Sequence, residues 1–188
     1  IRYRFYSSWG LSTTEITDVV AFNSLTFWLG FLTLGGLAFL LEPLALPAAL
    51  HLPFTSLRPL GGVFVLVVAT YVGASAYRRA PFTVHGWEFH FPTPALATIQ
   101  VLLSCLDWTL AGSVLYVLLP PMPALSYPHF LGIYLLAQLT GLVSQIPGGL
   151  GVFETVILML LAPTVPAAAV LASLFAYRGL YYFLPFVL

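Results

Sequence analysis

The sequence has very little charge: six basic and six acidic side chains among 188 residues, or 6% of the chain. A soluble globular domain carries about 25% charged residues, and so few charges could not cover the surface of one this size. Hydrophobic residues make up 60% of the chain, which also excludes an intrinsically disordered segment. The composition therefore predicts a protein that lies in a lipid bilayer.

Several kinds of site are excluded by what is missing. Cys105 is the single cysteine, which excludes a disulfide framework and any metal site built from several cysteines. The net charge is zero, so we expect no nucleic-acid partner. The four histidines fall in expected loops or interfacial positions, and the Gly-Gly-Leu-Gly run at 148–151 lacks the Lys-Ser/Thr of a phosphate-binding loop. We therefore expect no cofactor, no metal and no catalytic residue in this chain.

Three apolar runs, at 19–41, 59–77 and 94–119, are each long enough to cross about 30 Å of hydrocarbon as a helix. Ser12 and Glu15 have the spacing of a capping box at the start of the first helix. Between the second and third runs, residues 82–94 alternate around a turn residue, which predicts a short interfacial hairpin or an extended loop.

The next stretch does not divide into two ordinary spans. Residues 129–145 are long enough to cross most of the bilayer, and Ile-Pro-Gly-Gly-Leu-Gly at 146–151 breaks that helix. The piece that follows, 152–162, reaches only about 17 Å, so the glycine turn must lie within the membrane. Residues 167–188 form a last span. The predicted fold is an all-α polytopic integral membrane protein with about four full spans plus a re-entrant broken helical hairpin around 146–151.

The arginines predict the orientation. The positive-inside rule places the most basic side in the cytoplasm, and that side carries Arg2, Arg4, Arg78 and Arg79. Arg58 is then outside, beside Glu42, and both ends of the re-entrant hairpin are outside.

Three ionisable residues fall within apolar runs: Asp107, Glu154 and Arg178. With this topology all three lie in the middle third of the membrane, where an unpaired charge costs about 2.5–3.5 kcal/mol. One interpretation is a structural ion pair, Glu154 with Arg178. The interpretation we favour is a polar cavity for a charged substrate, because two carboxylates face one arginine.

Two stripes of polar or small residues share the helical spacing i, i+4, i+7 and i+11. The first contains Gln100, Ser104, Asp107 and Ala111, and the second contains Tyr134, Gln138, Gly141 and Gln145. Each stripe taken alone is typical of a helix-packing seam. Together with three charges at one depth, they favour a cavity.

The glycine turn leaves backbone N–H groups free at the start of the short helix 152–162. Such helix ends bind phosphates and carboxylates, and lipid phosphate is the anion that we expect there. Glu154 is about the third residue of that helix, so the alternative is that its carboxylate caps these N–H groups.

Four segments resemble the membrane domain of the bacterial lysylphosphatidylglycerol synthetase–flippases, the multiple peptide resistance factor family. They are Gln145-Ile-Pro-Gly-Gly-Leu-Gly-Val-Phe-Glu154, Tyr177-Arg-Gly-Leu-Tyr-Tyr-Phe-Leu-Pro-Phe186, residues 1–12, and residues 106–120. The resemblance covers nearly the whole chain in the same order.

The resemblance implies a parent protein in the bacterial cytoplasmic membrane that confers resistance to cationic antimicrobial peptides. Its soluble C-terminal domain would transfer lysine from aminoacyl-tRNA to phosphatidylglycerol, and its membrane domain would move the product from the inner to the outer leaflet. We expect residues 1–188 to be part of that flippase domain, without earlier helices and without the transferase, since the chain begins at Ile1 and ends within an apolar run. The expected partner is a membrane phospholipid, lysylphosphatidylglycerol or phosphatidylglycerol, and the domain could also form a homo-oligomer.

Three alternatives stay open: a flippase for another anionic lipid such as a polyprenyl phosphate, a passive scaffold for the transferase, and part of the lipid acceptor site of the enzyme. For the substrate-binding role the sequence nominates Asp107, Glu154, Arg178, Gln138, Gln145, Gly148, Gly149, Gly151 and Tyr181.

Overall fold

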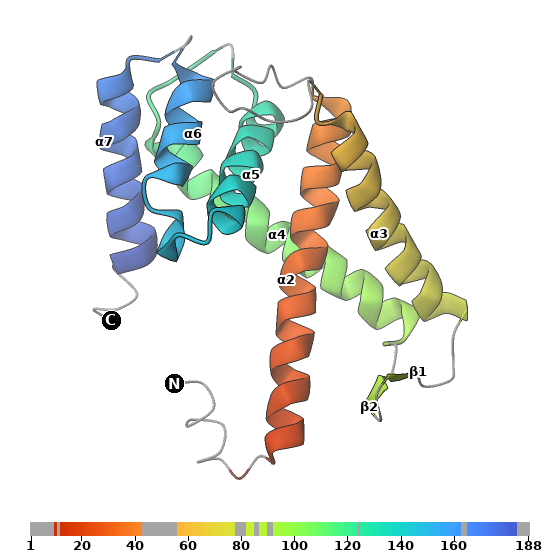
Figure 1. The fold of residues 1–188 in the computed structure, drawn as a ribbon. Coiled ribbons are helices and arrows are strands. Elements are labelled where there is room, and N and C mark those ends of the chain that lie inside the picture. Colours follow the sequence, from red (N-terminus) through yellow and green to blue (C-terminus); the bar gives the residue numbers. More distant parts are fainter. Residues whose placement is uncertain are drawn as a thin grey trace.

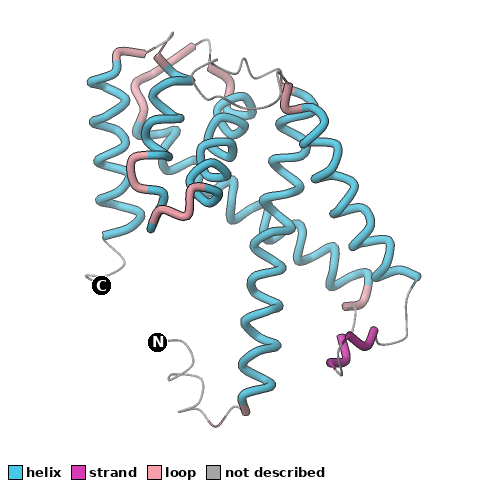
Figure 2. Tube along the Cα trace, viewed as in Figure 1, coloured by secondary structure: helices cyan, strands magenta, loops and turns pink. Residues whose placement is uncertain are grey.

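The structure is a computed structural model that describes residues 10, 12–42, 56–77, 82–84, 87–89, 92–123, 125–162 and 165–183. The predicted inside arginines (2, 4, 78 and 79) and the loop 43–55 lie outside the described residues, so the orientation in the membrane stays a prediction. Nearly all described residues are helical (Figures 1 and 2). In chain order the elements are α2 (Thr13–Leu41), α3 (Arg58–Tyr77), β1 (Phe82–Val84), β2 (Trp87–Phe89), α4 (Pro94–Leu118), α5 (Tyr127–Val143), η2 (Pro147–Gly149), α6 (Val152–Leu161), α7 (Ala167–Tyr177) and η3 (Arg178–Phe183).

Three of these helices, α2, α3 and α4, are long and apolar enough to cross a membrane. Their boundaries follow local capping chemistry. The Ser12 side chain accepts from the Glu15 N–H while the Glu15 carboxylate accepts from the Ser12 N–H at 2.8 Å, so the predicted capping box is confirmed. Thr93 caps α4 ahead of a proline in its first turn. The predicted hairpin is also confirmed, as an antiparallel β1–β2 pair, and its interfacial position stays a prediction.

The first three helices pack through small residues. Gly30 of α2 lies against Ser104 of α4, whose hydroxyl accepts from the Gly30 N–H at 3.2 Å. Gly61 of α3 lies so close to α2 that an added Cβ would come within 2.9 Å of the Gly36 carbonyl oxygen. Close backbone approach of this kind holds membrane helices together, because lipid offers no hydrophobic driving force between them.

The first predicted stripe forms the α2–α4 seam. Gln100, Ser104 and Ala111 are buried, and Gln100 donates to Thr26 of α2 at 3.0 Å. The seam interpretation of this stripe is therefore confirmed for these residues. Asp107 departs from it, because its side chain is exposed.

A broken helical hairpin follows, as predicted, and its re-entrant position in the membrane stays a prediction. Helices α5 and α6 run side by side, with the start of α5 and the end of α6 at the same end of the molecule and the turn partway along the length of α2 (Figure 1). With 17 and 10 residues, the two helices reach about 26 and 15 Å. Four residues of the turn have positive φ: Gln145, Gly148, Gly149 and Gly151.

The last predicted span, 167–188, is described as far as Phe183. It consists of the 11-residue α7 and a six-residue π-helical segment, η3. Residues 184–188 lie outside the described residues, so a fourth crossing stays a prediction. An aromatic core joins the hairpin to α2, α4 and α7, and Trp108 of α4 contacts both Phe31 and Tyr134. Its largest buried members include Phe31, Phe130, Tyr134 and Tyr177.

We predict that Gly30→Ala destabilises the α2–α4 contact. The added Cβ would lie 2.2 Å from the Ser104 hydroxyl oxygen and 2.4 Å from the Ser104 backbone, so the helices must separate. Overpacking of this kind costs about 1–3 kcal/mol of unfolding free energy, measurable by denaturant titration in mixed micelles. The control is Gly73→Ala in α3, where nothing lies within 4 Å. Equal stability of the two variants would contradict the prediction.

Candidate functional site

The site lies where the hairpin turns. Gly148 and Gly149 have φ of 64° and 61°, which residues with a Cβ rarely adopt. Gly149 is buried against the other arm of the hairpin, where an added Cβ would come within 3.2 Å of the Gly141 Cα. The turn therefore brings the two arms into backbone contact, and glycine is needed for both the dihedrals and the contact.

Glu154 holds the N-terminus of the short helix after the turn. Gly151 is the N-cap of α6, with φ of 82°, and its N–H donates to Glu154 Oε2 at 2.7 Å. A carboxylate in the first turn also offsets the positive end of the helix dipole. The capping role that the sequence left as an alternative is confirmed.

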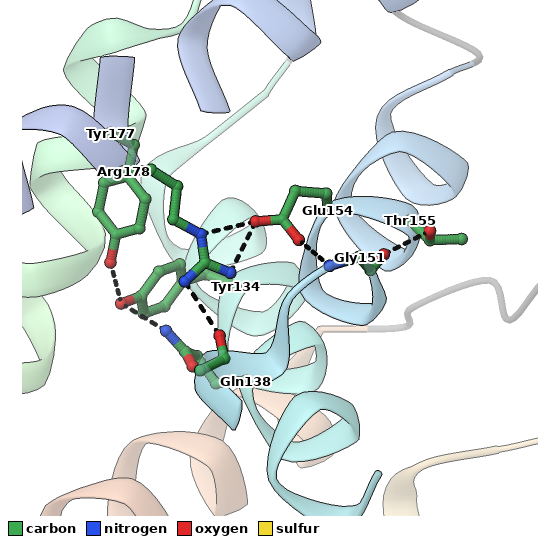
Figure 3. Close-up of polar contacts among 8 residues, drawn as sticks. Tyr134, Gln138, Gly151, Glu154, Thr155, Tyr177 and Arg178 are labelled. Atoms are coloured by element: carbon green, nitrogen blue, oxygen red, sulfur yellow. Dashed lines mark hydrogen bonds and ion pairs between the residues drawn. The ribbon is translucent and has the colours of Figure 1, made fainter. Parts of the chain in front are cut away.

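Arg178 reaches the same turn from the end of α7 (Figure 3). Its Nε donates to Glu154 Oε1 at 2.7 Å, and its Nη2 lies 2.7 Å from the same oxygen. Its Nη1 donates to the Gly148 carbonyl at 3.0 Å, and its guanidinium stands 5.6 Å from the centre of the Phe153 ring. The Arg178 and Glu154 side chains are only 11% and 20% exposed, so the ion pair is shielded.

A chain of hydroxyl and amide groups adjoins the ion pair. The hydroxyls of Tyr134 and Tyr177 are 2.9 Å apart, and Gln138 Nε2 donates to the Tyr134 hydroxyl at 3.1 Å (Figure 3). Tyr181 stacks on Tyr177 with ring centres 5.3 Å apart. These contacts join α5 to α7 and to the π-helical segment that starts at Arg178.

The structure thus brings together most of the nominated residues. Glu154, Arg178, Gly148 and Gly151 contact one another directly, while Gln138 and Tyr181 join them through the two tyrosines. Gly149 packs beneath, and Gln145 stands exposed at the end of α5 with φ of 56°.

Asp107 is the exception. The expectation that it meets Glu154 and Arg178 is wrong, because its side chain is exposed on α4 and forms no ion pair among the described residues. The reason is the phase of the helix. The buried face of α4 centres on Ser104, Trp108 and Leu115. The stripe predicted from the sequence was rotated slightly about the helix axis relative to this face, so Asp107 lies at its edge.

Three contacts were missed from the sequence. Phe153 beneath Arg178 carries no polar signal, and the Tyr134–Tyr177 contact joins residues 43 positions apart. The third is at the other end of α5, where His129 Nδ1 lies 3.2 Å from Glu42 Oε2, in the place where Arg58 was expected. Among the described residues, no group of three or more His, Cys, Asp or Glu side chains could hold a metal ion.

The arrangement is a neutral, bonded charge pair across a break in a helix. Its guanidinium has the planar donors that bind phosphate, and its carboxylate is an acceptor for an ammonium group. Both halves are already satisfied by each other, so a charged ligand could enter only by exchanging partners with them.

Comparison with known proteins identifies the family of this chain. The family described as "Lysylphosphatidylglycerol synthase TM region" matches residues 1–188. The chain belongs to this family. It is 47% identical over 185 residues to the uncharacterized protein slr0712 of Synechocystis sp., a match that covers 98% of this chain and 58% of that protein. It is 33% identical to the inner membrane protein YbhN of Escherichia coli K12, covering 100% of this chain and 59% of that protein.

The phosphatidylglycerol lysyltransferase of Staphylococcus aureus is also similar, at 42% identity over 89 residues. That match covers 46% of this chain and 11% of the lysyltransferase. The chain therefore spans somewhat more than half the length of the two relatives that it matches throughout, and the lysyltransferase is much longer than either. The resemblance to the lysylphosphatidylglycerol family seen in the sequence is confirmed.

We predict a strong coupling between Glu154 and Arg178 in a double-mutant cycle of Glu154→Gln, Arg178→Gln and the pair. Removing one partner leaves a shielded charge without its counterion, so we expect a coupling free energy of about 2 kcal/mol. The measurement is chemical unfolding in mixed micelles. A matched cycle of Asp107→Asn with Arg178→Gln should show less than about 0.5 kcal/mol. Equal coupling in the two cycles would contradict the assignment of the pair.

Proposed function

We propose that this chain belongs to a lipid-translocating protein of the bacterial cytoplasmic membrane, and that its substrate is an aminoacylated phosphatidylglycerol such as the lysyl lipid. The lipid would move from the inner to the outer leaflet. One observation carries the proposal: the Glu154–Arg178 pair bridges the break in the α5–α6 hairpin. Membership of a family of lysylphosphatidylglycerol synthase membrane regions supports a role in membrane lipid chemistry.

The charges of the proposed headgroup match this pair. Lysylphosphatidylglycerol carries one phosphate and two amines. Arg178 can bind the phosphate through two N–H donors, and Glu154 can accept from an ammonium group. In this exchange each protein charge gains a lipid partner as it loses its protein partner. Both protein charges and the phosphate then have partners, so no protein charge is left unpaired at a depth where it would cost about 2.5–3.5 kcal/mol. One of the two amines is left for another carboxylate.

The remaining nominated residues have proposed supporting roles. The turn glycines Gly148, Gly149 and Gly151 let the backbone approach the headgroup closely. Gln138, Gln145 and Tyr181 would offer hydrogen bonds along its path. Asp107, exposed on α4 and separate from the pair, would be a second carboxylate for an amine.

The whole protein's activity is a further part of the proposal. Where a member of the family carries a lysyltransferase domain, we propose that the domain makes the lipid that the membrane region moves, which would lower the negative charge of the outer surface and give resistance to cationic peptides. In this chain we assign no step of the transfer reaction to any residue.

A second candidate has a specific observation in its favour. The relatives that match the chain throughout are much shorter than the lysyltransferase, of which the match covers only 11%. A protein of that size could translocate a different anionic lipid, such as a polyprenyl phosphate. That substrate has no amine, so it would depend on Arg178 and not on Glu154.

We predict that Glu154→Gln and Arg178→Gln each slow translocation of a fluorescent lysylphosphatidylglycerol in proteoliposomes by about tenfold or more, because each removes a charge-assisted contact worth about 1.5–3 kcal/mol. Quenching by dithionite measures how much labelled lipid has reached the outer leaflet. The matched control is Glu15→Gln, in the capping box at the start of α2.

The outcomes separate the candidates. Slowing by Arg178→Gln alone, with a labelled polyprenyl phosphate moved at the wild-type rate by Glu154→Gln, would replace the aminoacyl lipid by the amine-free one. Unchanged rates in both variants, with the protein folded, would leave a passive scaffold and contradict translocation by this site.

A further inference from the structure

A cavity of about 530 Å³ lies at the end of α5 away from the hairpin turn, where the end of α2 meets the loop between α4 and α5. Ligand pockets of small molecules span about 300–1,000 Å³. We call it the Glu42–His129 cavity, and its lining residues are Glu42, Pro121, Met122, Pro123, Leu125, Ser126 and His129. Nothing in the hairpin site accounts for it.

The apolar wall of this cavity is held in place by specific bonds. The Tyr116 hydroxyl of α4 donates to the Leu125 carbonyl at 3.0 Å, and the Leu125 N–H donates to the Met122 carbonyl at 3.1 Å. The Leu125 side chain is 8% exposed and anchors the loop in the core. Prolines at 121 and 123 restrict the same loop further. The cavity is therefore a built feature of the fold.

The polar side of the cavity is rich in acceptors. Glu42 Oε2 lies 3.2 Å from His129 Nδ1, and about a third of each side chain is exposed. With the proton on Nδ1, the imidazole donates to Glu42 and keeps Nε2 as an acceptor. A carboxylate has about four lone-pair sites, so Glu42 can accept bonds beyond this one. Ser126 adds a hydroxyl.

This chemistry fits a cation with an aliphatic stem. The described lining contains one carboxylate and no arginine or lysine, so it offers a phosphate no permanent cation. A primary ammonium has three N–H donors for Glu42, His129 and Ser126, while its methylene groups would lie along Met122 and the prolines. We propose that the Glu42–His129 cavity binds the ammonium group of an aminoacylated lipid headgroup. This inference rests on the proposed function, since the cavity would receive the headgroup at the membrane face that the topology predicts to be outside.

The test uses the full chain in nanodiscs, labelled with ¹³C at Cε1 of histidine, with the His129 signal assigned by its loss in His129→Gln. Two probes separate the sources of ammonium: lysylphosphatidylglycerol added to phosphatidylglycerol nanodiscs, and soluble lysine ethyl ester added to phosphatidylglycerol nanodiscs. We expect both probes to shift the His129 signal, and Glu42→Gln to weaken each apparent affinity by about tenfold. Glu15→Gln at the other end of α2 should change neither.

Three results would overturn the inference: no shift with either probe, a shift with the soluble ester alone, or equal affinity in Glu42→Gln and wild type. The near-ultraviolet circular dichroism of Glu42→Gln checks that it folds, and the more conservative Glu42→Asp should bind with intermediate affinity. The measurement involves no movement of lipid between leaflets, so its result is independent of the translocation assay. Binding at the cavity can be found even if Glu154→Gln leaves translocation unchanged. Binding can also be missing even if translocation depends on Glu154.

Discussion

The hairpin depends on one shielded ion pair. Arg178 comes from a different helix than the turn it holds, and its guanidinium binds both the Glu154 carboxylate and the Gly148 carbonyl. Glu154 in turn binds the Gly151 N–H. A helix broken within a membrane leaves backbone groups that lipid cannot satisfy. These contacts satisfy part of that need from within the protein, and they tie α7 to the hairpin through the same atoms.

The two halves of the molecule are held together by different means. Between α2, α3 and α4 the contacts are close backbone approaches at Gly30, Gly36 and Gly61, and their outer faces expose large apolar side chains suited to lipid. Around the hairpin, aromatic rings and hydrogen bonds fill the same role, with Tyr134 in contact with both Phe153 and Tyr177. The polar chemistry is thus concentrated in the half that contains the break.

Most of the fold could be predicted from the sequence, because the governing signals are local. The ends of the long helices follow from run lengths and caps such as Ser12 and Thr93, and the break between α5 and α6 follows from a glycine run next to a short helix. The cost of charge in lipid led to two interpretations, a Glu154–Arg178 ion pair and the polar cavity that we favoured, and the structure shows the ion pair. The position of Asp107 could not be predicted, because a stripe of four residues fixes the buried face of a helix only to within a residue. Contacts between aromatic residues that are far apart in the sequence could not be predicted, because no pattern of residue spacing indicates them.

The π-helical segment that begins at Arg178 has a consequence for anyone projecting the last helix onto a wheel. A π turn takes up more residues than an α turn, so each residue after Tyr177 is rotated backwards relative to a projection with 3.6 residues per turn. Tyr177 and Arg178, which are consecutive where α7 passes into this segment, both contact the hairpin. An ideal wheel through residues 167–183 would therefore show Leu180 and Tyr181 rotated about the helix axis from their positions in the structure.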